Sequence, residues 1–178
     1  MKRRAQADTQ KISLPLYTPE QRARRDSTAW TWVQGVLAPV QFLVFVVSLI
    51  LVLTYLATGV GYGVATGSVV FKTLILYTIM ITGSVWEKEV FGVYLFAKPF
   101  FWEDVFSMAV LALHTAYLYG VFLGDWAPEL EMAVALAAYA AYVVNATQFV
   151  LKLRAARLDS RERCGASADV VVAEGDPA

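Results

Sequence analysis

Four long apolar runs, separated by shorter polar segments, dominate the pattern along the chain. A membrane-spanning helix needs about 20 mostly apolar residues, and each run is close to that length or longer. The runs are continuous and show no alternation of apolar and polar positions, which argues against half-buried strands. The pattern predicts an all-α integral membrane protein, a bundle of four transmembrane helices. The predicted spans are residues 32–57, 68–86, 100–123 and 130–153.

Composition agrees with a membrane protein and narrows the chemistry. Hydrophobic residues make up 58% of the 178 residues and charged residues 17%, and the formal net charge is zero. No global positive field is present to attract nucleic acid, so we expect no nucleic-acid partner. A single cysteine, Cys164, excludes an internal disulfide and a cysteine-based metal site. One histidine excludes a bis-histidine haem, and no glycine motif for phosphates is present, so we expect no cofactor and no metal of the protein's own.

The distribution of Lys and Arg predicts the orientation of the spans. These residues gather in residues 1–29 and 152–163, and Lys88 and Lys98 lie between the second and third spans. The other two loops carry none. Cytoplasmic loops are enriched in Lys and Arg, so both termini and the loop between spans two and three are predicted to be cytoplasmic.

The chain divides into three segments. Residues 1–29 form a basic N-terminal segment, in which Thr18 as cap and Pro19 at the first helical position predict a short amphipathic helix. Residues 30–158 hold the four spans. Residues 159–178 are polar and rich in Gly, Ala and Asp, which predicts a disordered cytoplasmic tail.

An acidic, aromatic stretch joins spans two and three. Residues 86–106 read WEKEVFGVYLFAKPFFWEDVF, with Trp-Glu near each end. Its acids are Glu87, Glu89, Glu103 and Asp104. One interpretation is that they only begin a helix, since acids favour helix N-termini, and otherwise face water. The stretch is however too apolar for an aqueous loop, and acids contribute little to orientation, so a functional site is the competing interpretation.

His114 and Lys72 are further ionisable residues within the predicted spans. His114 and Glu103 differ by about 20° around a helix and by about 16 Å along it, with Ser107 between them on the same face. Ionisable residues inside a membrane are costly and usually functional, although a packing role for His114 remains open. Lys72, near the other end of span two, is predicted to extend to the periplasmic interface.

Each span also offers a polar side chain to an interior. Asn145 and Gln148 share one face of the fourth span, and Gln34 and Gln41 share one face of the first. With the aromatic residues near the acids, they outline a pocket for a large, flat, apolar substrate. The predicted substrate-binding residues are Trp86, Lys88, Tyr94, Trp102, Ser107, Gln34, Gln41, Asn145 and Gln148.

Several blocks of the sequence are similar to one enzyme family. They are YTPEQRARRD, TWVQGVLAPVQFLVF, YTIMITGSVWEKEVFG, FFWEDVFSMAVLALHTAYL and NATQFVLKLRAARL. Over residues 16–158 the chain resembles the 3-vinyl bacteriochlorophyllide hydratase of purple phototrophic bacteria, called the 2-vinyl hydratase in older nomenclature. The resemblance implies hydration of the C3-vinyl group of a chlorophyllide to a 3-(1-hydroxyethyl) group, in the bacterial inner (intracytoplasmic) membrane. It assigns no catalytic residues.

The acids suit this reaction because it needs a proton donor, a base for water and a negative environment for a developing cation. Paired carboxyl groups supply all three when one stays protonated. We predict Glu87 and Glu103 as the central pair, with Asp104 and Glu89 as further candidates. His114 has two candidate roles, as the base for water or as axial ligand to the magnesium of the substrate.

Two other functions remain open on the residues alone. The first is a non-catalytic carrier or assembly protein for a tetrapyrrole, and the second is a small proton-coupled transporter, for which four spans are few. The expected partners are the tetrapyrrole and the lipid bilayer. A homo-oligomer, or association with neighbouring enzymes of pigment biosynthesis, is left open.

Overall fold

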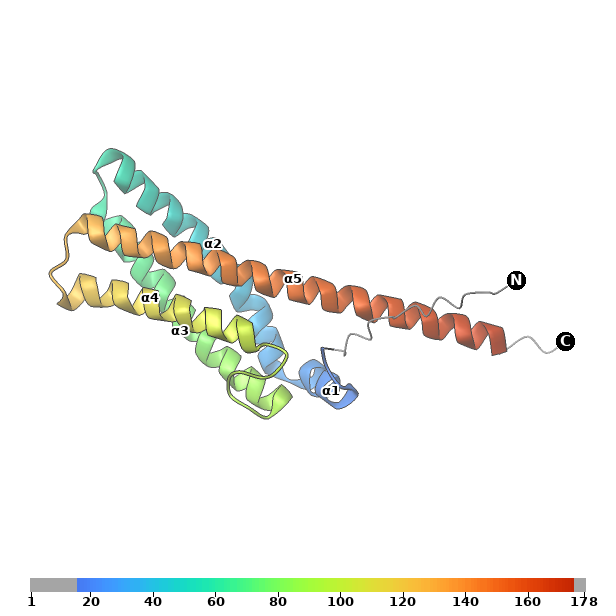
Figure 1. The fold of residues 1–178 in the computed structure, drawn as a ribbon. Helices are drawn as coiled ribbons and strands as arrows, with labels where there is room; N and C mark the ends of the chain where they lie inside the picture. Colours follow the sequence, from blue (N-terminus) through green and yellow to red (C-terminus); the bar gives the residue numbers. More distant parts are fainter. Residues whose placement is uncertain (1–15, 175–178) are drawn as a thin grey trace, which may run out of the picture.

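The structure, a computed structural model, describes residues 16–174, with side chains up to residue 158 apart from residue 156. The regular secondary structure of this part is all helix, and four of its helices are long and apolar enough to cross a membrane. The helices are α1 (Pro19–Ser27), α2 (Ala29–Thr58), α3 (Tyr62–Phe91), α4 (Phe101–Leu123) and α5 (Pro128–Glu174) (Figure 1). The predicted all-α class and the number of long apolar helices are confirmed.

Local sequence signals explain where the helices begin and end. The Thr18 hydroxyl accepts the backbone N–H of Gln21, and the Gln21 side chain accepts the backbone N–H of Thr18. This reciprocal cap and Pro19 start α1 as predicted. Gly59 and Gly92 end α2 and α3 with φ of 70° and 85°, a left-handed conformation that glycine adopts without steric cost.

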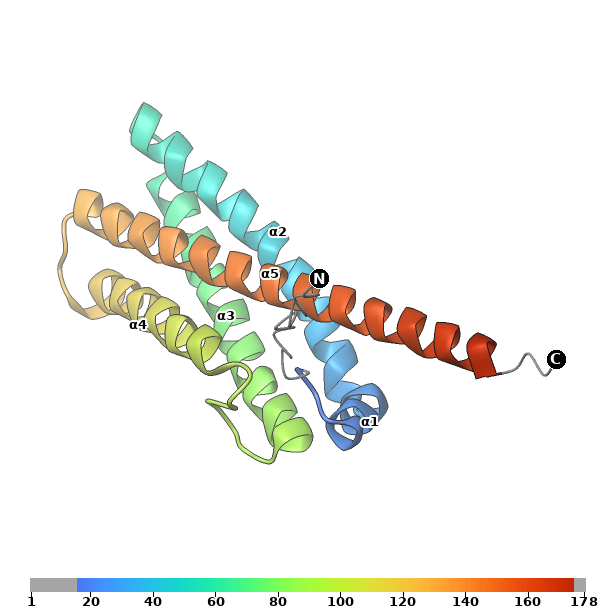
Figure 2. The same cartoon turned by 45° about the vertical axis from the view of Figure 1, so that its right-hand side comes forward.

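The four long helices form two antiparallel hairpins. In both views α2 lies beside α3 and α4 lies beside α5, and the second hairpin crosses the first (Figures 1 and 2). Apolar side chains from all four helices fill the middle of the bundle, including Phe45, Val69, Val110 and Tyr139. The acidic and aromatic residues are therefore held at one end of a packed bundle.

A smaller core closes the end of the bundle where α3 turns into α4. We call residues 92–100, between these helices, the connector. Tyr17 stacks on Phe91 with ring centroids 5.7 Å apart, and Trp86 meets Phe100 edge to face at 5.8 Å. Burial raises the pKa of the Tyr17 phenol, so this ring stays neutral. The segment before α1 is thus packed against the connector.

The C-terminal helix differs from the expectation. The structure continues α5 to Glu174, well beyond the bundle (Figure 1), where the sequence predicted a disordered tail from residue 159. No proline occurs between residue 159 and Glu174 to interrupt the backbone hydrogen bonds of a helix. Residues 1–15 and 175–178, which belong to the predicted N-terminal segment and tail, lie outside the described part.

Candidate functional site

Two buried carboxyl groups face each other beneath the connector. Glu87 lies in the last turns of α3 and Asp104 in the first turn of α4, and their carboxyl groups lie within hydrogen-bonding reach of each other. Two carboxyl groups can form such a bond only when one of them carries a proton, because an ionised carboxylate is only an acceptor. The geometry therefore suits a pair that shares one proton.

Backbone groups of the connector hold this pair in place. The Phe96 N–H donates to Asp104 Oδ2 at 2.7 Å, and the Ala97 N–H donates to Glu87 Oε2 at 3.2 Å. Phe96 has a φ of 62°, which is uncommon for a residue with a side chain. Such a residue lets successive N–H groups point to the same side. The connector is thus folded around the two acids.

The third acid of the stretch has a different partner. Lys152 on α5 donates to Glu103 Oε2 at 2.6 Å, and its ammonium lies 4.9 Å from the centre of the Phe100 ring. Successive residues on a helix point about 100° apart, so Glu103 faces α5 where Asp104 faces α3. The structure brings Glu87 together with Asp104, not with Glu103 as predicted from the Trp-Glu repeat.

Polar contacts continue between α4 and α5 below this ion pair. The Asn145 side chain donates to Ser107 Oγ at 2.8 Å. Asn145 Oδ1 and Gln148 Oε1 are buried, and neither has a hydrogen-bond partner among the described residues. Three of the predicted substrate-binding residues therefore lie within about two helical turns of the acids, on the helix face that carries Glu103 and Lys152.

His114 lies deep in the bundle, and both of its ring nitrogens are engaged. Nδ1 donates to the Val110 carbonyl at 2.8 Å, which leaves Nε2 as the acceptor for Lys72 Nζ at 2.7 Å. Both side chains have 0% exposure. No ring nitrogen is left free for a magnesium ion in this arrangement, so the ligand role is not carried further.

The prediction for Lys72 is wrong. Its side chain is buried in the bundle and does not reach a periplasmic interface. Besides bonding His114, its Nζ lies 4.3 Å from the centre of the Tyr142 ring and 5.2 Å from that of Tyr139. Lys72 lies on the face of α3 that points toward α4 and α5. The length and charge of the span do not reveal which face of the helix carries this residue.

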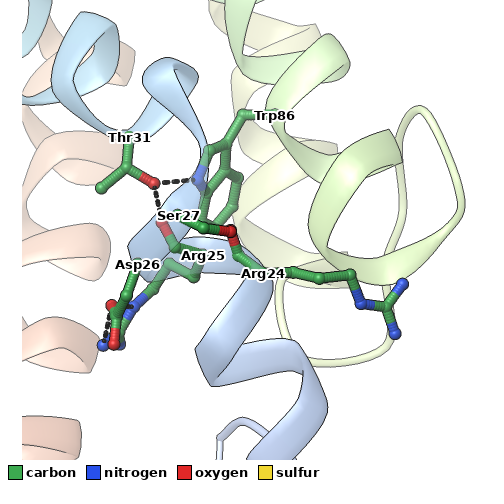
Figure 3. A network of polar contacts seen from close by, with 6 residues as sticks. All are labelled: Arg24, Arg25, Asp26, Ser27, Thr31 and Trp86. Atoms are coloured by element: carbon green, nitrogen blue, oxygen red, sulfur yellow. Dashed lines mark hydrogen bonds and ion pairs between the residues drawn. The ribbon is translucent and has the colours of Figure 1, made fainter.

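Trp86 joins the smaller core to the α1–α2 junction (Figure 3). Its Nε1–H donates to Thr31 Oγ1 at 2.9 Å, and the Thr31 hydroxyl donates to the Arg25 carbonyl at 2.6 Å. Gln34 donates to Thr82 on α3 at 2.7 Å, and Gln41 is buried. Trp86 and Gln34 therefore connect α3 to α2.

The remaining predicted residues are exposed. Glu89 accepts a hydrogen bond from the Thr28 hydroxyl at the start of α2, and Lys88 donates to the Gly92 carbonyl at 3.0 Å with its ammonium 5.1 Å from the Tyr94 ring centre. Tyr94 is 60% exposed and Trp102 67%. The structure thus separates Glu89 from the other three acids and turns the two aromatic side chains outward.

Some of the groups that contact the acids could not be predicted from residue types. The Phe96 and Ala97 groups that hold the acids are backbone N–H groups, available on almost any residue. Lys152 carried a usable signal, because it lies four residues after Gln148 and so shares its helix face.

Comparison with known proteins shows which family this chain belongs to. Residues 17–155 match the family model of the 2-vinyl bacteriochlorophyllide hydratase (BCHF). The chain belongs to this family. The match extends from just before α1 to the end of the membrane-length part of α5, so every residue of the acidic site lies inside it.

Two relatives carry the same hydratase name. A 2-vinyl bacteriochlorophyllide hydratase from Cereibacter sphaeroides is 68% identical over 145 residues, covering 81% of this chain and 89% of the relative. One from Rhodobacter capsulatus is 63% identical over 145 residues, covering 82% and 84%. No solved structure matches the chain significantly. The family resemblance inferred from the sequence blocks is confirmed.

Proposed function

We propose that this chain adds water to the C3-vinyl group of a chlorophyllide or bacteriochlorophyllide. The product carries a 3-(1-hydroxyethyl) group, on the route to bacteriochlorophyll a. The observation that carries the proposal is the 68% identity to a protein named as this hydratase. The buried, proton-sharing carboxyl pair supports it, because hydration needs an acid and a base and no redox group.

The acid pair has the parts for each step. The protonated member of Glu87 and Asp104 gives its proton to the terminal vinyl carbon, whose π electrons form the new C–H bond. Positive charge then develops on the carbon attached to the macrocycle, and the ionised carboxylates nearby, including Glu103, stabilise it. Water forms the C–O bond and returns a proton to the pair. The sum is vinyl plus water to hydroxyethyl, and the pair is regenerated.

Exposed apolar side chains around the connector suit the substrate. A chlorin is large, flat and largely apolar, and aromatic rings offer it wide contact area. Large exposed side chains gather within a few residues of the acids on the chain. They are Val93, Tyr94, Phe96, Phe101 and Trp102. In this proposal the pigment approaches over them with its vinyl edge toward Glu87 and Asp104.

Purified protein provides the first test. We expect protein in detergent or nanodiscs to convert a 3-vinyl chlorophyllide to the hydroxyethyl product without a redox cofactor. In water labelled with oxygen-18, mass spectrometry is expected to find one label per product. Pigment that binds but keeps its vinyl group would instead indicate a carrier.

We also propose a multi-pass protein of the bacterial inner membrane with both termini and the connector in the cytoplasm. The support is the concentration of Lys and Arg at the termini and the connector and their absence from the other two loops. Alkaline phosphatase fused after residue 60 or residue 126 is expected to be active. Fusions in the connector or after residue 158 are expected to be inactive, and the reverse pattern would contradict this orientation.

A further inference from the structure

Two buried amide oxygens at the α4–α5 interface lack a partner. Asn145 Oδ1 and Gln148 Oε1 accept no hydrogen bond from any described residue, although only 9% of the Asn145 side chain is exposed. Buried polar atoms are normally satisfied, by protein or by an ordered water. These two oxygens are therefore available to accept hydrogen bonds from a bound molecule.

Both oxygens lie on the face of α5 that packs against α4. Asn145 and Gln148 are three residues apart on α5, so they are neighbours on one helix face. The contact from Asn145 to Ser107 and the contact from Lys152 to Glu103 bracket this face on α4. Ser107 is three residues from Asp104, which is less than one turn. The unpartnered oxygens therefore lie along the α4–α5 interface, within about two helical turns of Glu103 and Asp104.

The two hydrogen-bond acceptors limit which molecule can bind between them. An amide oxygen only accepts hydrogen bonds, so the carbonyl and ring nitrogen groups of a pigment do not satisfy it. A water molecule has two hydrogens to donate, one to each oxygen. When both are engaged, its lone pairs point away from α5, free to attack the cationic carbon.

We infer that Asn145 and Gln148 are positioning residues that hold and orient the water added to the vinyl group. This inference rests on the proposed function. The vinyl carbon takes its proton from the Glu87–Asp104 pair, and the oriented water forms the C–O bond. One hydrogen of the resulting oxonium then leaves its amide acceptor and passes to the carboxylate left behind. No oxidant, reductant or other reactant is needed.

Without an oriented water the cation has another outcome. It can return a proton from its methyl carbon to the carboxylate and become a vinyl group again. In D2O the proton first added is a deuteron, so an abortive cycle that then loses one of the two original hydrogens places deuterium on the terminal vinyl carbon. Deuterium in unreacted pigment therefore reports protonation without water capture.

Gln148→Leu in the full-length protein is the main test. We expect kcat for hydration to fall about 10- to 100-fold, typical of lost positioning, with KM for the vinyl pigment unchanged. We expect deuterium per vinyl pigment, measured by mass spectrometry in D2O, to rise relative to hydrated product. Asn145→Leu is expected to act in the same direction. Thr147→Val is the matched control, since Thr147 is an exposed neighbour on α5 whose hydroxyl donates to the Val143 carbonyl of its own helix.

The thermal midpoint of the variant serves as the control for folding. Gln148→Leu removes an unpartnered buried oxygen, so the thermal midpoint in detergent is expected to stay unchanged or to rise. Wild-type kcat in both leucine variants would overturn the inference and leave the hydratase proposal intact. A raised KM without extra vinyl deuterium would also overturn it, in favour of pigment contact. Wild-type protein that forms no hydroxyethyl pigment would overturn the proposed function and this inference together.

Discussion

Glu87→Gln and Asp104→Asn are each expected to slow vinyl hydration about 100- to 10,000-fold, the range of a lost general acid or base. The two carboxyl groups lie within hydrogen-bonding reach of each other, and an amide in either position cannot pass its proton to carbon. Each amide oxygen still accepts the connector N–H that now meets Glu87 or Asp104, so folding is expected to survive. Initial rates of hydroxyethyl pigment formation by purified protein measure the effect.

Two further variants sharpen this test. Glu129→Gln makes the same chemical change on an exposed side chain at the other end of the bundle, and its rate is expected to match the wild type. Glu103→Gln keeps an acceptor for Lys152 and loses only the charge, so a smaller loss, about tenfold, is expected. If Glu103→Gln abolished hydration and Asp104→Asn did not, Glu87 and Glu103 would be the working pair after all.

The membrane-length helices were predictable because their signals are local. Each span is a continuous apolar run, and caps such as Thr18 with Pro19 act within a few residues. The predicted second span began at residue 68, whereas α3 begins at Tyr62. Glycines such as Gly63 and Gly67 lower helix propensity only modestly, and packing against α2 overrides that cost.

The pairings inside the site depend on helix rotation, which the sequence does not state. Glu103 and Asp104 are adjacent in sequence and point to different helices, so a repeated Trp-Glu could not say which acid meets Glu87. The rotation follows from how the two hairpins cross, and that crossing is a property of the whole bundle. Residues that share a face of one helix, such as Asn145 and Gln148, are fixed by helical geometry alone, so their proximity could be predicted from the sequence.

The contact between Lys72 and His114 shows the same limit across a longer distance. The residues lie 42 positions apart, and each has a plausible separate role in its own span. Only the packing of α3 against α4 makes them partners. Their burial makes them partners in one contact, and a structural role for that contact can be tested.

His114→Ala is expected to lower the free energy of unfolding by about 3 kcal/mol or more. The change leaves a cavity and removes the only acceptor that the structure gives to the buried Lys72 Nζ among the described residues. Denaturant titration in mixed detergent micelles, followed by tryptophan fluorescence, measures the loss.

The double variant Lys72→Met/His114→Leu separates this structural role from a role toward the pigment. Replacing both partners by apolar side chains of similar size removes the unmet donor together with its acceptor, so most of the lost stability is expected to return. Hydration is expected to return with it, because neither residue touches the acid pair. Stable double-variant protein that bound pigment with an altered absorption spectrum would instead show that His114 contacts the substrate.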